Sequence, residues 1–202
     1  LIARDSEALR ALAAELGESA SRAFPADLAD REQVLRLASE ASAWAPPDVL
    51  VNNAGLGDYR GFLEHTPSEH ERIIDVNLRA IVHLCHGVLP GMLERGHGHI
   101  VNIASDLACR PMANMAVYAA SKFGLRGLSL SLMKEFKDRG IRVSLVNPGM
   151  IDTAFHTGEE GRLDPASALQ PAQVAETVLQ LLTQPGFQMV DEITLHAVHQ
   201  DY

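Results

Sequence analysis

A tyrosine and a lysine stand four residues apart at Tyr118 and Lys122. On a helix this spacing places the two side chains on one face, about one turn from each other. A free tyrosine has a pKa near ~10, and a cation a few ångströms away lowers that pKa because it favours the ionised form. We therefore expect Lys122 to make Tyr118 a usable general acid and base near neutral pH.

The elements that must position this pair are short apolar strands alternating with helices. Strands are expected at 1–3, 22–26, 48–52, 99–104, 141–146 and 190–195. Helices are expected from Asp5 or Ser6 to Gly17, from Asp30, from about Pro67 to Leu93, from about Val117 to Arg139, and from Pro171. Strict alternation with apolar strands predicts a doubly wound parallel sheet in a three-layer α/β/α arrangement, built as a single domain over residues 1–202.

Ligands of such sheets bind at the carboxyl ends of the strands, so the residues that follow each strand matter most. The sequence Asn52-Asn53-Ala54-Gly55 follows one strand, Ser105 follows the next, and Asn147-Pro148-Gly149 follows another. Ser105 lies thirteen positions before Tyr118. We expect these segments to meet at one edge of the sheet.

This ordered set resembles the classical short-chain dehydrogenases/reductases, and the resemblance runs from Leu1 to about Leu195. It implies a Rossmann-like fold and an NAD(P)-dependent oxidoreductase that interconverts a carbonyl and a secondary alcohol. Hydride would pass between the nicotinamide and the carbonyl carbon, with Tyr118 as general acid/base.

The resemblance also implies roles for the neighbours of Tyr118. Ser105 would hydrogen-bond the substrate carbonyl oxygen and stabilise the charge that develops there. Lys122 would hydrogen-bond the nicotinamide ribose. Asn77 matches the family's helix asparagine that holds a water in the proton relay. The predicted catalytic residues are therefore Asn77, Ser105, Tyr118 and Lys122.

In this family the end of the second strand reads the adenosine ribose: an acid there suits NAD, and a basic residue suits the 2′-phosphate of NADP. The chain has Ala3 at the apparent acid position and Arg4 after it, whereas Asp5 can serve as a helix cap. Because the guanidinium fork suits a phosphate, we expect NADP rather than NAD.

Further cofactor contacts follow from the same resemblance. Asp27 matches the acid that bonds the adenine amino group, and Leu28 would contribute its backbone N–H. Asn53, Ala54 and Gly55 would pack beside the adenosine ribose, where small residues allow close approach. Pro148 and Gly149 would shape the nicotinamide pocket, and Ile151 and Thr153 would bond the carboxamide.

The sequence departs from the family in lacking a Gly-rich turn between a first strand and a first helix, which would bind the pyrophosphate at a helix N-terminus. Either an N-terminal βα unit of roughly 30 residues precedes Leu1, or the unit is truly lost. Since the missing strand is central in the 3-2-1-4-5-6 order, its absence would leave two sheet edges open, and we expect a longer native protein. The alternative function is a catalytically impaired binding or regulatory protein that lacks this turn.

Two features bear on the substrate. Asp106 directly follows Ser105, and its carboxylate either disfavours acidic substrates or points to solvent. The polar stretch 154–170 is expected to be a mobile lid that carries specificity, with Phe155, His156 and Leu163 as candidate contacts. A short lid favours a small or flat substrate.

Composition narrows the possible partners. The formal charge of −9 argues against nucleic-acid binding, and we expect no membrane partner because no apolar run reaches the ~20 residues of a membrane helix. Two cysteines favour free thiols in a reducing, cytoplasmic compartment. The nine histidines suggest no metal site. The helices at about 67–93 and 117–139, with Leu130 and Met133 on them, are expected to form a homodimer or homotetramer.

Overall fold

The computed structural model describes residues 1–17, 20–157 and 161–200. Its first elements are β1 (Ile2–Ala3), α1 (Ser6–Leu16), β2 (Phe24–Pro25), α2 (Arg31–Trp44) and β3 (Val49–Asn52). They are followed by α3 (Pro67–Ile74), the π-helical segment η2 (Asp75–Arg79), α4 (Ala80–Arg95), β4 (Gly98–Ile103), α5 (Ala116–Phe136) and β5 (Ile141–Pro148). The last are α6 (Ala154–Thr157), α7 (Pro171–Leu182) and β6 (Glu192–Leu195).

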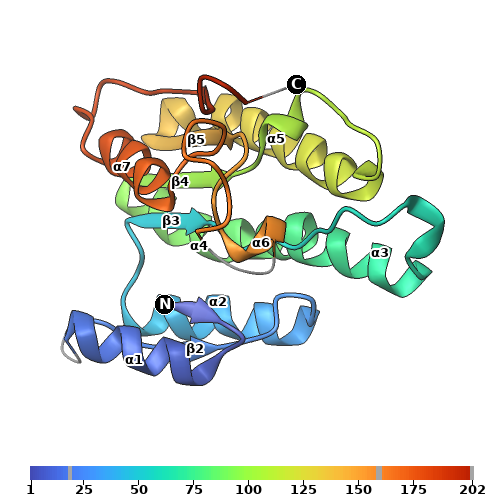
Figure 1. Ribbon diagram of the computed structural model, residues 1–202. Helices are drawn as coiled ribbons and strands as arrows, with labels where there is room; N and C mark the ends of the chain where they lie inside the picture. Colours follow the sequence, from blue (N-terminus) through green and yellow to red (C-terminus); the bar gives the residue numbers. More distant parts are fainter. Residues whose placement is uncertain (18–19, 158–160, 201–202) are drawn as a thin grey trace.

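All strand pairs are parallel, as the sequence predicts, but they form two sheets. One pairs β1 with β2, and the other has the order β3-β4-β5-β6. Figure 1 shows β1 and β3 pointing the same way on either side of a gap between the sheets. β3 is an edge strand of the four-stranded sheet, and its residues Val49 and Val51 are each 41% exposed.

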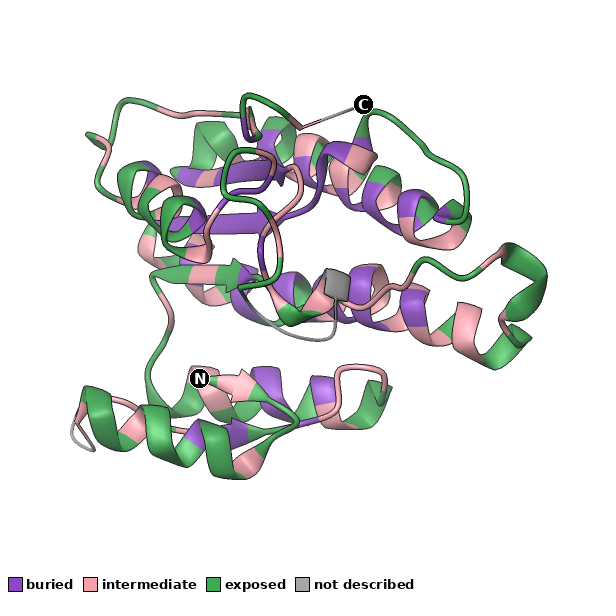
Figure 2. Ribbon diagram, in the orientation of Figure 1, coloured by how far each residue is buried: buried purple, intermediate pink, exposed green. Residues whose placement is uncertain are grey.

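Helices cover both faces of the four-stranded sheet and so form the expected three layers. On one face, α4 and α5 pack their apolar side chains against β4 and β5, with Met92, Ile100, Leu125, Ile141 and Leu145 fully buried. On the other face, α7 packs Leu181 against Val101 and Val146. β4 and β5 are accordingly the most buried elements (Figure 2).

The unit made of β1, α1, β2 and α2 joins the rest through α2, which packs on α4. Gly87 permits this close approach, because a Cβ there would lie 2.6 Å from the Ala38 Cβ. Three leucines of α1 and α2 are exposed: Leu12 by 43%, Leu16 by 53% and Leu35 by 37%. The small two-stranded sheet offers too little surface to cover these positions.

The helix starts follow the predicted capping residues. The carboxylate of Asp5 accepts hydrogen bonds from the backbone N–H groups of Glu7 and Ala8, and Asp30 accepts from Glu32 and Gln33. Such caps satisfy backbone donors that have no partner within the helix. Asp5 therefore acts as a helix cap, as expected.

The helical stretch from Pro67 to Arg95 is 29 residues long and has a mean hydropathy of 1.2 in its most apolar window, so by length and composition it meets the test for a membrane span. The expectation that no stretch would meet that test is wrong. Half of this window is buried inside the protein, where α4 packs on α2 and β3. The core helix of a soluble protein passes the same test, so this match is weak evidence for a membrane.

The interpretation of Met133 as part of an oligomer surface places it outside the core. In the structure Met133 lies within the core. It is 7% exposed and packs in the cluster of α4, α5 and the sheet, and Leu130 packs partly against the same cluster. Phe123 on α5 and Val82 on α4 are the exposed apolar residues of these helices, at 42% and 40%. Oligomerisation through these helices stays a prediction.

The buried His99 on β4 should make folding sensitive to acid. Its Nε2 lies 2.9 Å from the Ser144 hydroxyl, and its Nδ1 has no partner among the described residues. Burial lowers the pKa of His99 from 6.5 to about 4. Between these values the unfolded chain binds a proton that the folded chain does not, so stability falls as the pH drops from 6.5 towards 4, by up to about 3 kcal/mol.

We therefore expect His99→Gln to flatten the loss of unfolding free energy between these pH values, measured by urea denaturation. The exposed His97→Gln serves as the control and should leave the wild-type pH dependence in place. Equal pH dependence in the wild type and His99→Gln would contradict the assignment.

Candidate active site

A cavity of about 670 Å³ lies at the carboxyl ends of β3, β4 and β5. It brings together three segments that the sequence places at strand ends: 53–55, 103–107 and 148–151. The amino-terminal part of α5 closes one side with Met115, Tyr118 and Lys122. The predicted edge of the sheet is therefore a single pocket with a largely apolar lining.

Buried amide hydrogen bonds fix how these elements meet. The Asn52 Nδ2 on β3 donates to the side-chain Oδ1 of Asn102 on β4 at 2.8 Å, and the Asn102 Nδ2 donates to the Ser129 hydroxyl on α5 at 2.8 Å. All three residues are buried. Leaving any of these groups unpaired would be costly, so the contacts set both the β3–β4 register and the position of α5.

Tyr118 projects from α5 into the cavity, close enough to Ser105 at the end of β4 for the serine hydroxyl to lower the pKa of the phenol. Ser105 also accepts a hydrogen bond from the backbone N–H of Leu107 at 3.1 Å, which fixes its side chain. Ser105 and Tyr118, which the sequence predicts to share one site, line the same cavity.

The electrostatics of Tyr118 differ from expectation. Burial raises the pKa of Tyr118 to about 12; the Ser105 hydrogen bond lowers that pKa, whereas Tyr59 and Asp106 raise it. Lys122 is not among the groups that shift it. The prediction that Lys122 brings the Tyr118 pKa towards neutrality is therefore wrong for the protein without cofactor, because removing the phenol from water outweighs any nearby cation.

Lys122 lies over the face of the Tyr118 ring. Its Nζ is 5.6 Å from the Tyr118 ring centroid and donates to the Ile103 carbonyl oxygen at 3.0 Å. Lys122 is 3% exposed, and burial lowers its pKa to about 8. An ammonium has three donors, so two remain without a protein acceptor among the described residues.

Asn77 sits in the π-helical turn η2 that interrupts the helix between α3 and α4. Its Oδ1 accepts from the Leu56 N–H, and its Nδ2 donates to the Leu56 carbonyl and to the Ser121 hydroxyl, at 2.8, 2.8 and 3.0 Å. Single π turns occur frequently at functional sites. Both amide hydrogens are thus used, and the side chain ties the segment after β3 to α5; the predicted water contact stays a prediction.

Asp106 does not point to solvent: it is 8% exposed and lines the cavity. Its Oδ1 accepts from the Ser105 hydroxyl and its Oδ2 from the Gln200 amide, each at 3.0 Å. Gln200 also accepts from the Met150 N–H at 2.8 Å. Sequence reasoning missed Gln200, because a glutamine in the segment after the last strand carries no local signal.

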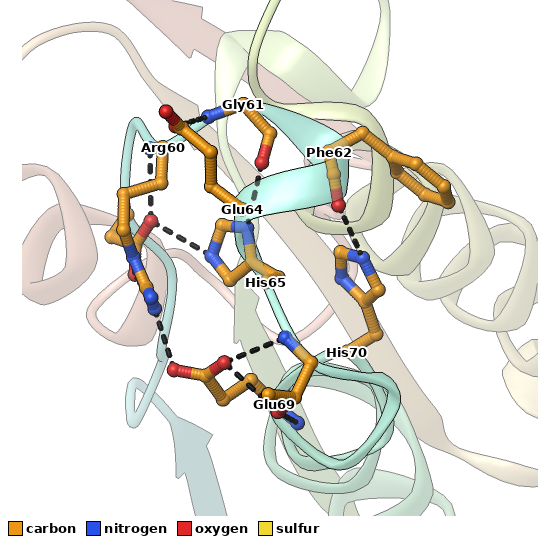
Figure 3. A network of polar contacts seen from close by, with 9 residues as sticks. Arg60, Gly61, Phe62, Glu64, His65, Glu69 and His70 are labelled. Atoms are coloured by element: carbon orange, nitrogen blue, oxygen red, sulfur yellow. Dashed lines mark hydrogen bonds and ion pairs between the residues drawn. The ribbon is translucent and has the colours of Figure 1, made fainter.

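Tyr59 was also missed; it lines the cavity from the loop after β3. Figure 3 shows the contacts that hold this loop against α3. Arg60 bridges Asp58 and Glu69 at 2.8 and 2.7 Å, and the His65 ring lies 2.8 Å from Asp58. These ion pairs fix the base of the loop next to the cavity.

The predicted cofactor contacts fall into two groups. Seven of them line the cavity: Asn53, Ala54, Gly55, Pro148, Gly149, Ile151 and Thr153. Arg4, Asp27 and Leu28 do not; they follow β1 and β2. Both oxygens of Asp27 accept hydrogen bonds from Arg72, at 3.1 and 2.9 Å. The Asp27 carboxylate is thus already paired in the absence of an adenine.

The predicted lid is partly described. Phe155 lines the cavity and lies 5.7 Å from the Tyr118 ring, centroid to centroid, whereas Leu163 does not line it. The side chain of His156 lies outside the described residues. Asp152 is 3% exposed and accepts from the N–H groups of Gly161, Arg162 and Leu163, which ties the segment to the end of β5.

Within the described part of the chain, no group of three or more His, Cys, Asp or Glu residues could hold a metal ion. Cys85 is buried and Cys109 is exposed, and both are free.

The chain resembles known oxidoreductases in sequence and structure. An uncharacterized oxidoreductase of Staphylococcus aureus strain USA300 is 32% identical over 98% of the chain and 85% of its own length. An alcohol dehydrogenase from the archaeon Thermococcus sibiricus, solved with 5-hydroxy-NADP, has a TM-score of 0.89 at 28% identity, covering 100% of this chain and 86% of that one. The closed form of a serine dehydrogenase complexed with NADP+ has a TM-score of 0.86 at 30% identity, covering 100% and 85%.

The family model for short chain dehydrogenases matches residues 1–162. Together with the parallel α/β fold and the Ser105–Tyr118–Lys122 cavity, this match shows that the chain belongs to the short-chain dehydrogenase family of oxidoreductases.

Proposed function

We propose that the protein interconverts a carbonyl and a secondary alcohol with NADP, and that Tyr118 transfers the proton. The observation that carries the proposal is the contact of Tyr118 with Ser105 inside a cavity whose wall also contains Lys122. The NADP and 5-hydroxy-NADP bound to two similar structures support the choice of cofactor.

The residues of the cavity fit the nicotinamide half of such a cofactor. The buried ammonium of Lys122 keeps two donors for ribose hydroxyls, which are strong acceptors. Gly55 leaves space beside the Lys122 ammonium, since a Cβ added at Gly55 would still lie 3.7 Å from the Lys122 Nζ. Pro148, Ile151 and Thr153 would flank the nicotinamide ring. NADPH, when bound, supplies the hydride that the carbonyl carbon accepts.

The raised pKa of Tyr118 keeps the phenol protonated near neutral pH. The protonated phenol is the form that a general acid needs in order to donate to the carbonyl oxygen. Ser105 would donate a hydrogen bond to the same oxygen and stabilise the negative charge that develops on it.

We expect Tyr118→Phe to lower kcat for carbonyl reduction by at least ~100-fold, because general acid catalysis contributes roughly that much. Binding of NADPH, measured by fluorescence titration, should change little. Undiminished reduction would refute the proton-donor role. A wild-type protein that binds NADPH but reduces no carbonyl in a broad panel would favour the non-catalytic alternative.

Arg4 is proposed to select NADP over NAD. It follows β1, and its charge acts on Asp27 after β2. Arg4→Ala should lower kcat/KM for NADPH by roughly 10- to 100-fold, since a charge-assisted bond to a phosphate is lost, and should leave NADH nearly unaffected. Arg10→Ala, an exposed arginine on α1, is the control. An unchanged NADPH to NADH ratio in Arg4→Ala would exclude this role.

Gly57 is the position where an added methyl group would disturb the proton donor most directly. A Cβ there would lie 2.5 Å from the Tyr118 ring, whereas a Cβ at Gly127 on α5 meets nothing within 4 Å. Gly57→Ala should therefore reduce kcat by tenfold or more, while Gly127→Ala should keep wild-type activity and gain up to ~1 kcal/mol of stability. Equal activity of the two variants would contradict this placement of Tyr118.

A further inference from the structure

We infer that Asp106 selects the substrate: the site favours secondary alcohols and ketones that carry a protonated amine one or two carbons from the reacting carbon, and disfavours carboxylates. This inference rests on the proposed function, because it assigns the substrate class of the same cavity.

Asp106 is a buried carboxylate within the active site. Its Oδ1 lies 3.0 Å from the Ser105 Oγ, and Ser105 and Tyr118 line the same cavity. A substrate oxygen held by Ser105 and Tyr118 is therefore only a few ångströms from this carboxylate. A substituent one or two carbons from the reacting carbon can reach it, whereas a more distant one lies elsewhere in the cavity.

The hydrogen bonds leave the Asp106 side chain with acceptor capacity. Each oxygen accepts one hydrogen bond, one from the Ser105 hydroxyl and one from the Gln200 amide. A carboxylate has about four lone-pair sites, and a ligand can use those that remain. The Gln200 bridge to the Met150 N–H keeps the carboxylate in place.

The donors to the Asp106 carboxylate within the described part of the chain are uncharged. They are the Ser105 hydroxyl and the Gln200 amide, and the ion pairs of the described residues do not include Asp106. A buried charge without a counter-ion is unfavourable. A ligand ammonium would supply the counter-ion, a ligand hydroxyl would supply only a hydrogen bond, and a ligand carboxylate would add repulsion.

An ammonium would also change the state of Ser105. The serine hydroxyl has a single proton, which it donates to Asp106 in the structure. Because a ligand amine can replace that bond, Ser105 becomes free to donate to the substrate oxygen. Amine-bearing substrates should therefore gain in kcat as well as in KM.

The test uses a matched series, CH3–CH(OH)–CH2–X, in which X is an ammonium, a hydroxyl, a methyl or a carboxylate group. We would measure kcat/KM for oxidation with NADP+ at a pH of about 8, where an alkylammonium stays protonated. The amine should exceed the methyl compound by roughly 10- to 100-fold, as expected for a hydrogen bond to a charged group, and the carboxylate should be the poorest substrate. An amine no better than the methyl compound would overturn the inference.

Variants separate charge selection from a structural role. Asp106→Asn should remove most of the preference for the amine and improve the carboxylate, while Asp106→Glu should keep the preference. Asp138→Asn removes the same charge from an exposed turn outside the cavity and should behave as wild type. If Asp106→Asn keeps the preference, the inference is wrong; if that variant does not fold, the order of the wild-type series decides.

Calorimetric binding of the same four compounds to the wild type distinguishes failure of the inference from failure of the proposed function. If no compound is oxidised but the amine still binds at least tenfold more tightly than the methyl compound, the proposed function fails and the ligand class stands. If all four bind alike, the assignment of Asp106 fails whatever the activity.

Discussion

The buried contact of Asn52, Asn102 and Ser129 holds the site together. It links β3, β4 and α5 through amides and a hydroxyl that water does not reach. Each residue lies next to a functional segment: Asn52 precedes Asn53–Gly55, Asn102 precedes Ser105 by three residues, and Ser129 follows Lys122 by two helical turns. A shift of register would separate the Asn52 amide from Asn102, so the contact favours the observed pairing of β3 with β4.

Burial within this frame decides the chemistry of the site. Removing Tyr118 from water raises its pKa, and removing Lys122 from water lowers its pKa, so the two groups move towards their uncharged forms. The cavity is thus prepared to donate a proton rather than to hold a tyrosinate. Two further acceptors, the Ile103 carbonyl and the Asp106 carboxylate, orient Lys122 and Ser105.

Much of this arrangement could be predicted from the sequence, because strand ends in a parallel sheet meet at one edge. Local patterns predict the helix starts at Asp5, Asp30 and Pro171. They also predict the parallel strands and the meeting of Ser105 with Tyr118. Gln200 and Tyr59 could not be predicted, because their contacts with the site depend on loop conformation. The predicted lowering of the Tyr118 pKa is wrong. Residue spacing indicates that a cation is near the phenol, but it does not indicate how deeply the phenol is buried.

The exposed leucines of α1 and the unpaired edges of β1 and β3 also show that a local sequence pattern does not report what surrounds a residue in the fold. A hydrophobic stripe predicts which face of a helix turns inward, but the burial of that face depends on the surface available opposite it. The two-stranded sheet offers little such surface, whereas β4 and β5 are covered on both faces.

Label transfer tests the central claim most directly. With NADPH deuterated at the transferring position of nicotinamide C4 and a ketone substrate, mass spectrometry would follow the deuterium. The account predicts one deuterium on the carbinol carbon of the product from the wild type, and almost no labelled product from Tyr118→Phe. A product without deuterium, or equal labelling by both proteins, would contradict hydride transfer assisted by proton donation from Tyr118.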